Sequence, residues 1–189
     1  MQLSNVVFKT CSFVALFDLD GTLVHTDEAN FLAYQQAVKQ VMPNMSIEQQ
    51  SNLRFDSDEL YRQLPDLSTF EYMRIIACKR KLDNEFISHT HLNSDLVTKL
   101  KKLSQISQTY LVTNAHEARA QLTLKKHNLT HLFDGMFFKE DRGCDANKYQ
   151  HALSNIAVAK ENVIVFENES IQVRHAHAAG IPIQNIHKV

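Results

Sequence analysis

The sequence is poor in several residue types, and each shortage narrows the kind of protein that it encodes. Its 189 residues include only 4 glycines and 3 prolines, below typical usage of about 7% and about 5%, so a helix-rich fold is expected. The 3 cysteines lie far apart and form no Cys-x-x-Cys pair. We therefore expect neither a disulfide framework nor a structural zinc site, and a cytoplasmic location is the default for such a chain.

A charge excess of one sign is also lacking. The 20 Lys and Arg residues face 21 Asp and Glu residues, which leaves a formal net charge of −1. Without a strong basic field, neither nucleic acid nor an anionic membrane is expected as a partner. The apolar segment 11–17 has the length of a strand and falls far short of the roughly 20 residues that a membrane-spanning helix needs. With 44% apolar and 22% charged residues, the composition is that of a folded, soluble protein.

The order of the apolar segments predicts an α/β fold. Residues 13–17 are continuously apolar and predict a buried strand. From about residue 26 to 88, apolar side chains recur at helical spacing, and Pro43 and Pro65 interrupt the helices. Beyond this stretch, strands are expected at 108–113, 135–138, 162–166 and 181–183, and helices at 96–103, 116–127, 148–156 and 170–179. This alternation predicts a parallel sheet covered by helices, with the helical stretch inserted after the first strand.

Polar residues follow three of the expected strands at the point where each strand ends. They are Asp18 and Asp20 after the first strand, Thr113-Asn114 after the second, and Glu167-Asn168-Glu169 after the fourth. Because parallel α/β sheets place their sites at the carboxyl ends of strands, these groups are expected to meet at one edge of the sheet.

The spacing of Asp18 and Asp20 indicates phosphate chemistry. The two carboxylates are two residues apart at a strand end, and Gly21 permits a sharp turn, so both can point toward one place. Like charges that close need a cation or a shared proton. Mg²⁺ prefers such oxygen ligands, and a carboxylate beside it can attack phosphorus while the second transfers a proton. The alternative interpretation is that the two aspartates only cap a turn.

Segment 17–23 (Phe-Asp-Leu-Asp-Gly-Thr-Leu) resembles the first motif of the haloacid dehalogenase (HAD) superfamily. Segments 111–115 and 163–170 resemble its second and fourth motifs. The helical insertion resembles the cap of the branch that includes phosphoglycolate phosphatases and β-phosphoglucomutases. The resemblance implies a Rossmann-like three-layer core formed by residues 1–24 and 89–189, with an inserted all-α cap at 25–88. Within this cap, one apolar stripe is expected to be core: Phe70, Met73, Ile76 and Ala77.

The resemblance also implies roles for the polar residues. Asp18 would be the nucleophile, Asp20 the general acid and base, and Thr113, with the loop at Asn114, would bind the phosphoryl oxygens. Mg²⁺ would be held by Asp18, by the backbone carbonyl of Asp20 and by a residue of the fourth motif, Glu167 or Asn168. The implied activity is Mg²⁺-dependent hydrolysis of a small phosphate monoester through an aspartyl-phosphate. Arg54, in a cap loop, either contacts the substrate or is a solvated residue near a helix start.

Three positions depart from the family pattern. Asn168 stands where an acidic residue is usual, and its amide oxygen brings no charge to a metal. The third motif lacks its common Lys-Pro form, so we assign its cation to Lys148, with Arg142 and Lys139 as alternatives and a surface lysine as the plain interpretation. Asn30 occupies the place of a mutase histidine, which favours hydrolysis over mutase chemistry. The alternative function is a weakly active or inactive protein that binds a phosphorylated metabolite or a partner.

Overall fold

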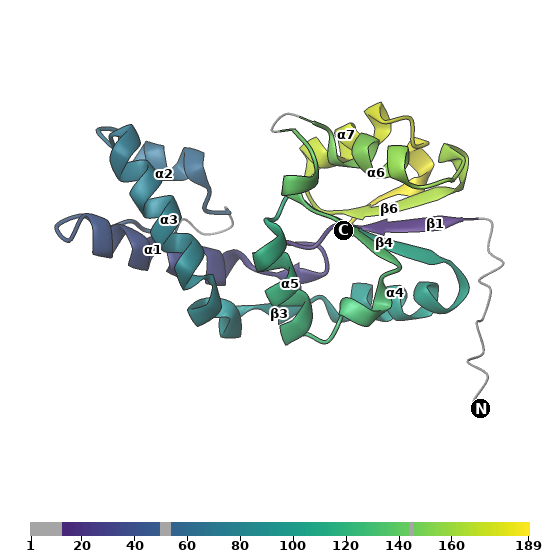
Figure 1. The fold of residues 1–189 in the computed structure, drawn as a ribbon, viewed down its shortest axis with the longest axis horizontal. Coiled ribbons are helices and arrows are strands. Elements are labelled where there is room, and N and C mark those ends of the chain that lie inside the picture. The colour runs from purple at the N-terminus through teal and green to yellow at the C-terminus, as the bar shows by residue number, and fades with distance from the viewer. Residues whose placement is uncertain (1–12, 50–53, 144–145) are drawn as a thin grey trace.

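A five-stranded parallel sheet organises the larger part of the molecule. The computed structural model describes residues 13–49, 54–143 and 146–189, so Cys11 and Cys144 lie outside the described residues. The strands are β1 (Val14–Phe17), β4 (Gln108–Val112), β5 (Gly135–Phe137), β6 (Val163–Glu167) and β7 (Ile186–Lys188). Their order in the sheet is β5-β4-β1-β6-β7, and every neighbouring pair is parallel (Figure 1). The predicted α/β fold with a parallel sheet is therefore confirmed.

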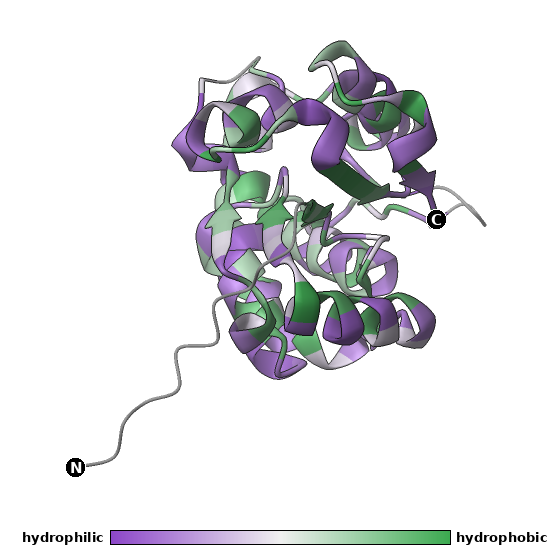
Figure 2. Cartoon of the chain, turned by 90° about the vertical axis from the view of Figure 1, so that its right-hand side faces the viewer, coloured by the Kyte–Doolittle hydropathy of each residue, from purple (hydrophilic) through white to green (hydrophobic). Residues whose placement is uncertain are grey.

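Helices cover both faces of this sheet and make three layers. Helices α4 (Ser94–Ile106) and α5 (Glu117–Lys126) lie on one face, and α6 (Lys148–Asn155) and α7 (Ser170–Ala178) lie on the other (Figure 1). Short 3-10 turns connect several of these elements: η2 (Thr130–Leu132), η3 (Lys139–Asp141), η4 (Lys160–Asn162) and η5 (Ile183–Asn185). Figure 2 shows the green, hydrophobic strands between helices that carry purple, hydrophilic residues. This is the pattern expected of a sheet that is buried on both faces.

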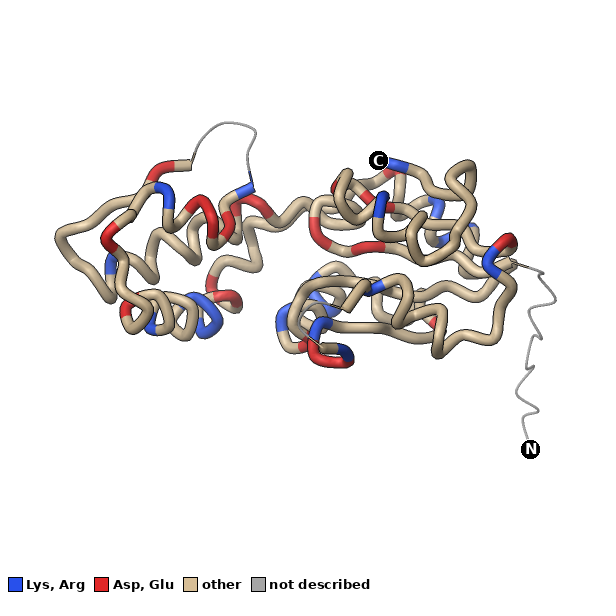
Figure 3. The backbone as a smooth tube through the Cα atoms, turned by 90° about the horizontal axis from the view of Figure 1, so that it is seen from above, with Lys and Arg blue, Asp and Glu red and all other residues tan. Residues whose placement is uncertain are grey.

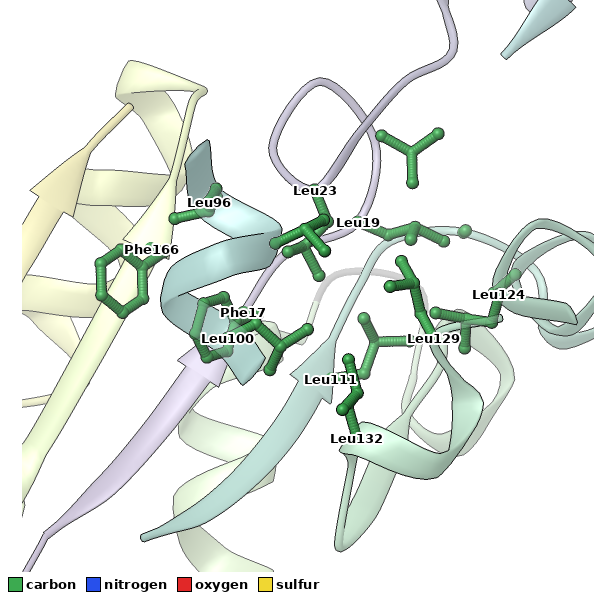
Figure 4. Packing of buried hydrophobic residues seen from close by; sticks show 14 of the residues in the cluster. Phe17, Leu19, Leu23, Leu96, Leu100, Leu111, Leu124, Leu129, Leu132 and Phe166 are labelled. Atoms are coloured by element: carbon green, nitrogen blue, oxygen red, sulfur yellow. The ribbon is translucent and has the colours of Figure 1, made fainter. Parts of the chain in front are cut away.

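The central strand β1 shows why its sequence is apolar without a break. Its side chains alternate between the two faces, so Phe17 packs with the α4–α5 layer while Leu16 packs with the α6–α7 layer. Figure 4 shows the first of these clusters, in which Phe17 lies among leucines of α4 and β4. The ring of Phe17 also stacks on Phe166 of β6 at 4.6 Å between centroids. Both faces of β1 are therefore core, and its carboxyl end is held rigidly.

Three helices form a separate layer beside the sheet. They are α1 (Asp27–Val41), α2 (Ser57–Gln63) and α3 (Thr69–Phe86), with the turn η1 (Ile87–His89) after them. The strands β2 (Val24–His25) and β3 (His91–Leu92) pair antiparallel and form the stem that joins this helical part to the sheet. Asp56 caps α2 by accepting the backbone N–H of Glu59 at 2.9 Å, as expected from its position before a helix. The exact limits of a cap domain, 25–88, stay a prediction.

The apolar stripe predicted for the core of the helical part is wrong at three of its four positions: Ile76 is partly buried against that core, whereas Ala77 is exposed. Phe70 and Met73 are 69% and 64% exposed, respectively. Helix α3 instead turns Ile75, Lys79 and Leu82 inward. This buried face is hard to predict from the sequence because a lysine lies in its middle. The stem of Lys79 is buried, and its ammonium pairs with Asp83 at 3.2 Å.

The last strand also lies later than predicted. The segment expected as a strand, 181–183, leads into the 3-10 turn η5, and the strand is Ile186–Lys188. Pro182 has no N–H to donate, and the register that pairs β7 with β6 places Ile186 opposite Val165. Gly180 does have the left-handed backbone expected after α7, with φ of +97°. Among the described residues, no helix is long and apolar enough to cross a membrane.

Candidate active site

The three polar strand ends lie together at one edge of the sheet. In the register of the sheet, Phe17 is opposite both Leu111 of β4 and Phe166 of β6. Asp18, which comes next, continues this pairing because its N–H donates to the carbonyl of Phe166 at 3.1 Å. Thr113 follows β4 in the same way and donates its N–H to the carbonyl of Phe137 at 3.0 Å. The parallel strands thus bring the ends of segments more than 90 residues apart to one place.

Gly21 turns the chain back immediately after the two aspartates. Its φ is +74°, a left-handed conformation that side chains rarely adopt. A Cβ atom at this position would overlap the side-chain amide of Asn168. The glycine therefore lets the β1 loop lie directly against the loop that follows β6, where Thr22 Oγ1 donates to Asn168 Oδ1 at 3.0 Å.

Lys148 forms the charged centre of the site. Its ammonium Nζ lies 2.7 Å from Asp18 Oδ1 and 2.7 Å from Glu167 Oε2, and its side chain is only 1% exposed. Lys148 is the first residue of α6, and Asn147 caps that helix by accepting the N–H of Tyr149 at 2.9 Å. The cap fixes where α6 begins and so directs Lys148 toward the strand ends.

Glu167 is fully engaged by its neighbours. Tyr149 OH donates to Oε2 at 2.7 Å, Lys148 contacts the same oxygen, and the N–H of Glu169 donates to Oε1 at 3.0 Å. The residue is 0% exposed. In this structure Glu167 thus serves as a buried counter-ion of Lys148.

The other two cations considered for the third motif lie elsewhere. Arg142 donates Nη1 to the carbonyl of Phe138 at 2.7 Å and Nε to the carbonyl of Ala146 at 3.1 Å, and Nη2 to Asn114 Oδ1. It therefore ties the loop after β5 to the loop after β4. Lys139 is exposed and borders the cavity described below. Of these three candidates, Lys148 alone contacts Asp18 in the described structure.

The surroundings of Asp18 disfavour its charge in the absence of a metal. Burial raises the pKa of Asp18, the ammonium of Lys148 lowers it, and the carboxylate of Glu167 raises it again, with a net value of about 7. Its Oδ1 accepts from Lys148, whereas no hydrogen bond from a described residue reaches Oδ2. Asp18 therefore offers one oxygen to a ligand.

Asp20 has the opposite environment, and the residue responsible was not foreseen. Arg119 of α5 donates Nη1 to Asp20 Oδ1 at 2.8 Å and also pairs Nη2 with Oδ2. Thr26 Oγ1 donates to Oδ1 at 2.8 Å, and Arg54 Nη2 lies 3.7 Å from Oδ2. Burial alone would raise the pKa of Asp20, but the charge and hydrogen bonds of Arg119, with a smaller effect of Arg54, hold it well below its usual value. Arg119 stands in a helix rich in polar residues, and no motif singled it out.

Thr113 and Asn114 form the rim of the site beside α5. Thr113 is buried, and its Oγ1 accepts the N–H of Ala115 at 3.0 Å. Glu117 N–H, at the start of α5, already donates to Glu140 Oε2 at 3.1 Å.

Comparison with known proteins agrees with this geometry. A family model described as haloacid dehalogenase-like hydrolase matches residues 15–186. The chain belongs to this family. The family assignment makes it a hydrolase and confirms the resemblance noted from the three motifs.

Solved structures of this HAD-like family share the fold. A haloacid dehalogenase-like hydrolase from Streptococcus pneumoniae matches with a TM-score of 0.74 at 20% identity, covering 89% of this chain and 81% of the other. A predicted phosphoglycolate phosphatase from Haemophilus somnus matches with 0.74 at 20% identity, covering 90% and 84%. A predicted β-phosphoglucomutase from Thermotoga maritima matches with 0.65 at 21% identity, covering 93% and 84%.

The donor set of this HAD-like hydrolase suits a metal that keeps much of its water. Asp18 offers a carboxylate oxygen, Asp20 a backbone carbonyl and Asn168 an amide oxygen, all beside the Gly21 turn. Within the described ranges, no cluster of three or more His, Cys, Asp or Glu side chains could hold a metal. Mg²⁺ is commonly bound by one or two carboxylates, several waters and a substrate phosphate. The residues therefore fit Mg²⁺, with less charge than two acidic side chains would supply.

A cavity of about 1020 Å³ adjoins the site between α3 and α5. Its walls come from the helical part and from the sheet part, and Asn114, Arg119 and Arg54 border it. Arg54 also pairs with Glu169 of the fourth motif at 3.3 Å. The predicted substrate contact, Arg54, thus lies where the cap meets the strand ends.

Proposed function

We propose that this HAD-like hydrolase is a Mg²⁺-dependent phosphatase that hydrolyses a phosphate monoester of a small metabolite through an aspartyl-phosphate on Asp18. The main support is the contact between Lys148 and Asp18. One oxygen of Asp18 is fixed by the buried ammonium, and the other accepts no hydrogen bond from a described residue. A carboxylate held in one orientation at a strand end is suited to in-line attack on phosphorus.

The proposed reaction has two steps. In the first, an oxygen of Asp18 bonds to phosphorus, the ester P–O bond breaks, and Asp20 gives its proton to the leaving oxygen. In the second, a water attacks the phosphoaspartate, Asp20 takes a proton from it, and Asp18 and inorganic phosphate are released. Lys148, Thr113 and the backbone at Asn114 stabilise the charge on the phosphoryl oxygens.

The Mg²⁺ ion would be held by Asp18, the backbone carbonyl of Asp20 and Asn168. Glu167 is not expected to bind the ion, because both of its oxygens already accept hydrogen bonds from protein groups. When bound, such an ion neutralises charge on the phosphoryl oxygens. Because Asn168 is neutral, we expect weaker metal binding than two acidic side chains would give.

Asn30 supports hydrolysis rather than a mutase reaction. Its Nδ2 donates to the carbonyl of Phe55 at 2.6 Å, so it ties α1 to the segment before α2. The mutase pattern that this sequence resembles has a histidine at this position, which helps to couple cap closure to proton transfer, and an amide cannot replace it. The predicted phosphoglycolate phosphatase among the similar structures also agrees with a phosphatase.

A second function is favoured by one observation. Asp20 must carry a proton to act as an acid, yet Arg119 and Arg54 hold it as a paired carboxylate. An inactive protein that binds a phosphorylated metabolite would keep this ion pair permanently. In either case the ligand is a small phosphorylated metabolite, and the cytoplasm stays the predicted location.

Phosphate release from a panel of phosphorylated metabolites, with and without Mg²⁺, separates the two functions. We expect wild-type turnover that needs Mg²⁺ and disappears in Asp18→Asn. Activity that appears only in Asn168→Asp would show a sound nucleophile beside a weakened metal site. Failure of both proteins on the whole panel, combined with metabolite binding by calorimetry, would favour the binding function.

A further inference from the structure

The cavity between α3 and α5 is strongly cationic. Only two of its lining residues are carboxylates, Asp83 and Glu140. Six are Lys or Arg: Arg54, Lys79, Arg80, Arg119, Lys125 and Lys139. Figure 3 shows Lys and Arg segments on the facing sides of the helical part and the sheet part. A concave surface of this kind concentrates anions.

Half of these cations already have a partner. Lys79 pairs with Asp83 at 3.2 Å. Arg119 pairs with Asp20, and Arg54 lies between Asp20 and Glu169. These three are therefore neutralised by carboxylates of the protein itself.

The remaining carboxylate of the cavity does not neutralise a lysine or arginine. Glu140 Oε1 lies 2.6 Å from Nδ1 of His116, and Arg80 lies 3.0 Å from the other ring nitrogen, Nε2. A guanidinium can only donate, so Nε2 accepts from Arg80 and Nδ1 donates to Glu140. Arg80 itself has no carboxylate of the described residues within ion-pair distance.

Lys125 and Lys139 complete the set of uncompensated cations. No carboxylate of the described residues lies within ion-pair distance of either ammonium. Arg80, Lys125 and Lys139 come from three elements, α3, α5 and η3, and stand on both walls of the cavity. Three cations without a carboxylate partner, all lining one cavity, suit the dianion of a phosphate better than the single charge of a carboxylate.

The position of Lys125 sets the separation from the reacting site. Asn114 and the start of α5 adjoin the place where the reacting phosphate would bind, and Lys125 lies eight residues beyond Glu117. At 1.5 Å per residue this is about 12 Å along the helix. A two-carbon acid would leave most of a 1020 Å³ cavity empty.

We propose that this cavity binds a second phosphate group, distant from the one that is cleaved, so that the substrate is an extended bisphosphorylated metabolite. The inference rests on the proposed phosphatase function for the cleaved group. Lys125 marks the far end of this cavity and, with Arg80 and Lys139 nearer the start of α5, supplies positive charge for the distal phosphate, which lies between the helical part and the sheet part.

Two synthetic esters that differ only in the distal phosphate test this: hexane-1,6-diol bisphosphate and hexyl phosphate. The first readout is the ratio of their kcat/KM values for phosphate release with Mg²⁺. The second is the ratio of their Kd values, measured by calorimetry in EDTA. In the wild type we expect both ratios to favour the bisphosphate by about tenfold or more, because one charge-assisted hydrogen bond to the distal phosphate has an effect of this size. The shorter propane-1,3-diol bisphosphate should lose much of this advantage.

Matched variants locate the effect. The double variant Lys125→Met/Lys139→Met should bring both ratios close to one, whereas Lys126→Met, the next residue on α5, should leave them unchanged. Lys126 is exposed like Lys125 but does not line the cavity. Arg80→Met and its neighbour Lys81→Met form a second pair of this kind in α3.

The outcomes separate this inference from the proposed function. Turnover of both esters with ratios near one overturns the distal site and leaves the phosphatase intact. A preference that survives in Lys125→Met/Lys139→Met also overturns it. Tighter binding of the bisphosphate that depends on Lys125 and Lys139, without turnover of either ester, supports the distal site and refutes the phosphatase. Absence of both binding and turnover refutes both.

Discussion

Replacing Lys148 with methionine removes the ammonium that lies between two buried carboxylates. Both Asp18 and Glu167 contact it at 2.7 Å, and their side chains are 7% and 1% exposed, respectively. Methionine keeps the volume and apolar stem but leaves the two carboxylates facing each other without a cation. Removing one partner of a buried ion pair costs about 3–5 kcal/mol. We expect the free energy of unfolding at pH 7 to fall by about 3 kcal/mol or more.

The pH dependence makes this prediction specific. In the wild type the pKa of Asp18 is raised to about 7, so its protonated form stabilises the native state below that pH and the contribution is lost as the pH rises through 7. Without Lys148, which lowers that pKa, the native state keeps its extra proton to a higher pH. Stability should therefore go on falling above pH 7, by up to about 1.4 kcal/mol per pH unit for one proton.

Urea unfolding in EDTA at pH 7, 8 and 9 measures both effects. The contribution of Asp18 to the free energy of unfolding should be nearly constant over this pH range in the wild type. In Lys148→Met the free energy of unfolding should fall steadily as the pH rises. Lys99→Met, at an exposed lysine of α4, is the matched control and should change stability by less than about 0.5 kcal/mol. Two results would refute the view that this ammonium stabilises both carboxylates. One is a free energy of unfolding of Lys148→Met that stays constant from pH 7 to 9, and the other is a loss of less than about 1 kcal/mol relative to the wild type.

Three further predictions concern the same edge of the sheet. Arg119→Met should cost about 3 kcal/mol at pH 7 in urea unfolding, because it leaves buried Asp20 with the hydroxyl of Thr26 and, as its one remaining cation among the described residues, Arg54 at 3.7 Å. As the pKa of Asp20 is depressed in the fold, the gap from the wild type should narrow as the pH falls below about 4, and a gap that is constant down to pH 3 would contradict it. Gly21→Ala should lower the free energy of unfolding by about 1–3 kcal/mol, because residue 21 has a left-handed backbone and the added Cβ would clash with Asn168. Gly143→Ala is the control and should have little effect, since no atom lies within 4 Å of the added Cβ. Equal thermal unfolding temperatures for the two variants would refute this difference. Mg²⁺ affinity, measured by calorimetry, should fall about tenfold for each pH unit below 7, because Asp18 must lose its proton to bind the ion; a level affinity from pH 5.5 to 7 would exclude Asp18 as a ligand with this pKa.

The sequence predicted well wherever a local rule determines the structure. Strand β1 is apolar on both faces because it is the middle strand of the sheet, and such a run has few alternatives. The convergence of Asp18, Thr113 and Glu167 followed from parallel strands alone. Gly180 ends α7 with the left-handed residue that a helix end favours.

The sequence was a poor guide where distant residues decide. Helix α3 has two faces that could be apolar, and only its packing against α1 shows that Ile75 rather than Phe70 is buried. Arg119 lies 99 positions from Asp20 and belongs to no motif, so nothing in the sequence pairs them. Lys148 was assigned as the cation with two alternatives, Arg142 and Lys139, because only the position where Asn147 starts α6 distinguishes them.

The two aspartates are held in states opposite to those that the first step of hydrolysis requires. Asp18 must be ionised to attack, yet burial raises its pKa, and Asp20 must be protonated to act as an acid, yet Arg119 lowers its pKa. Both obstacles weaken when ligands arrive, because a carboxylate loses its proton on binding a divalent cation and a phosphate competes with Asp20 for the arginines. The proposed reaction therefore depends on the ligands to reverse the resting protonation of this pair.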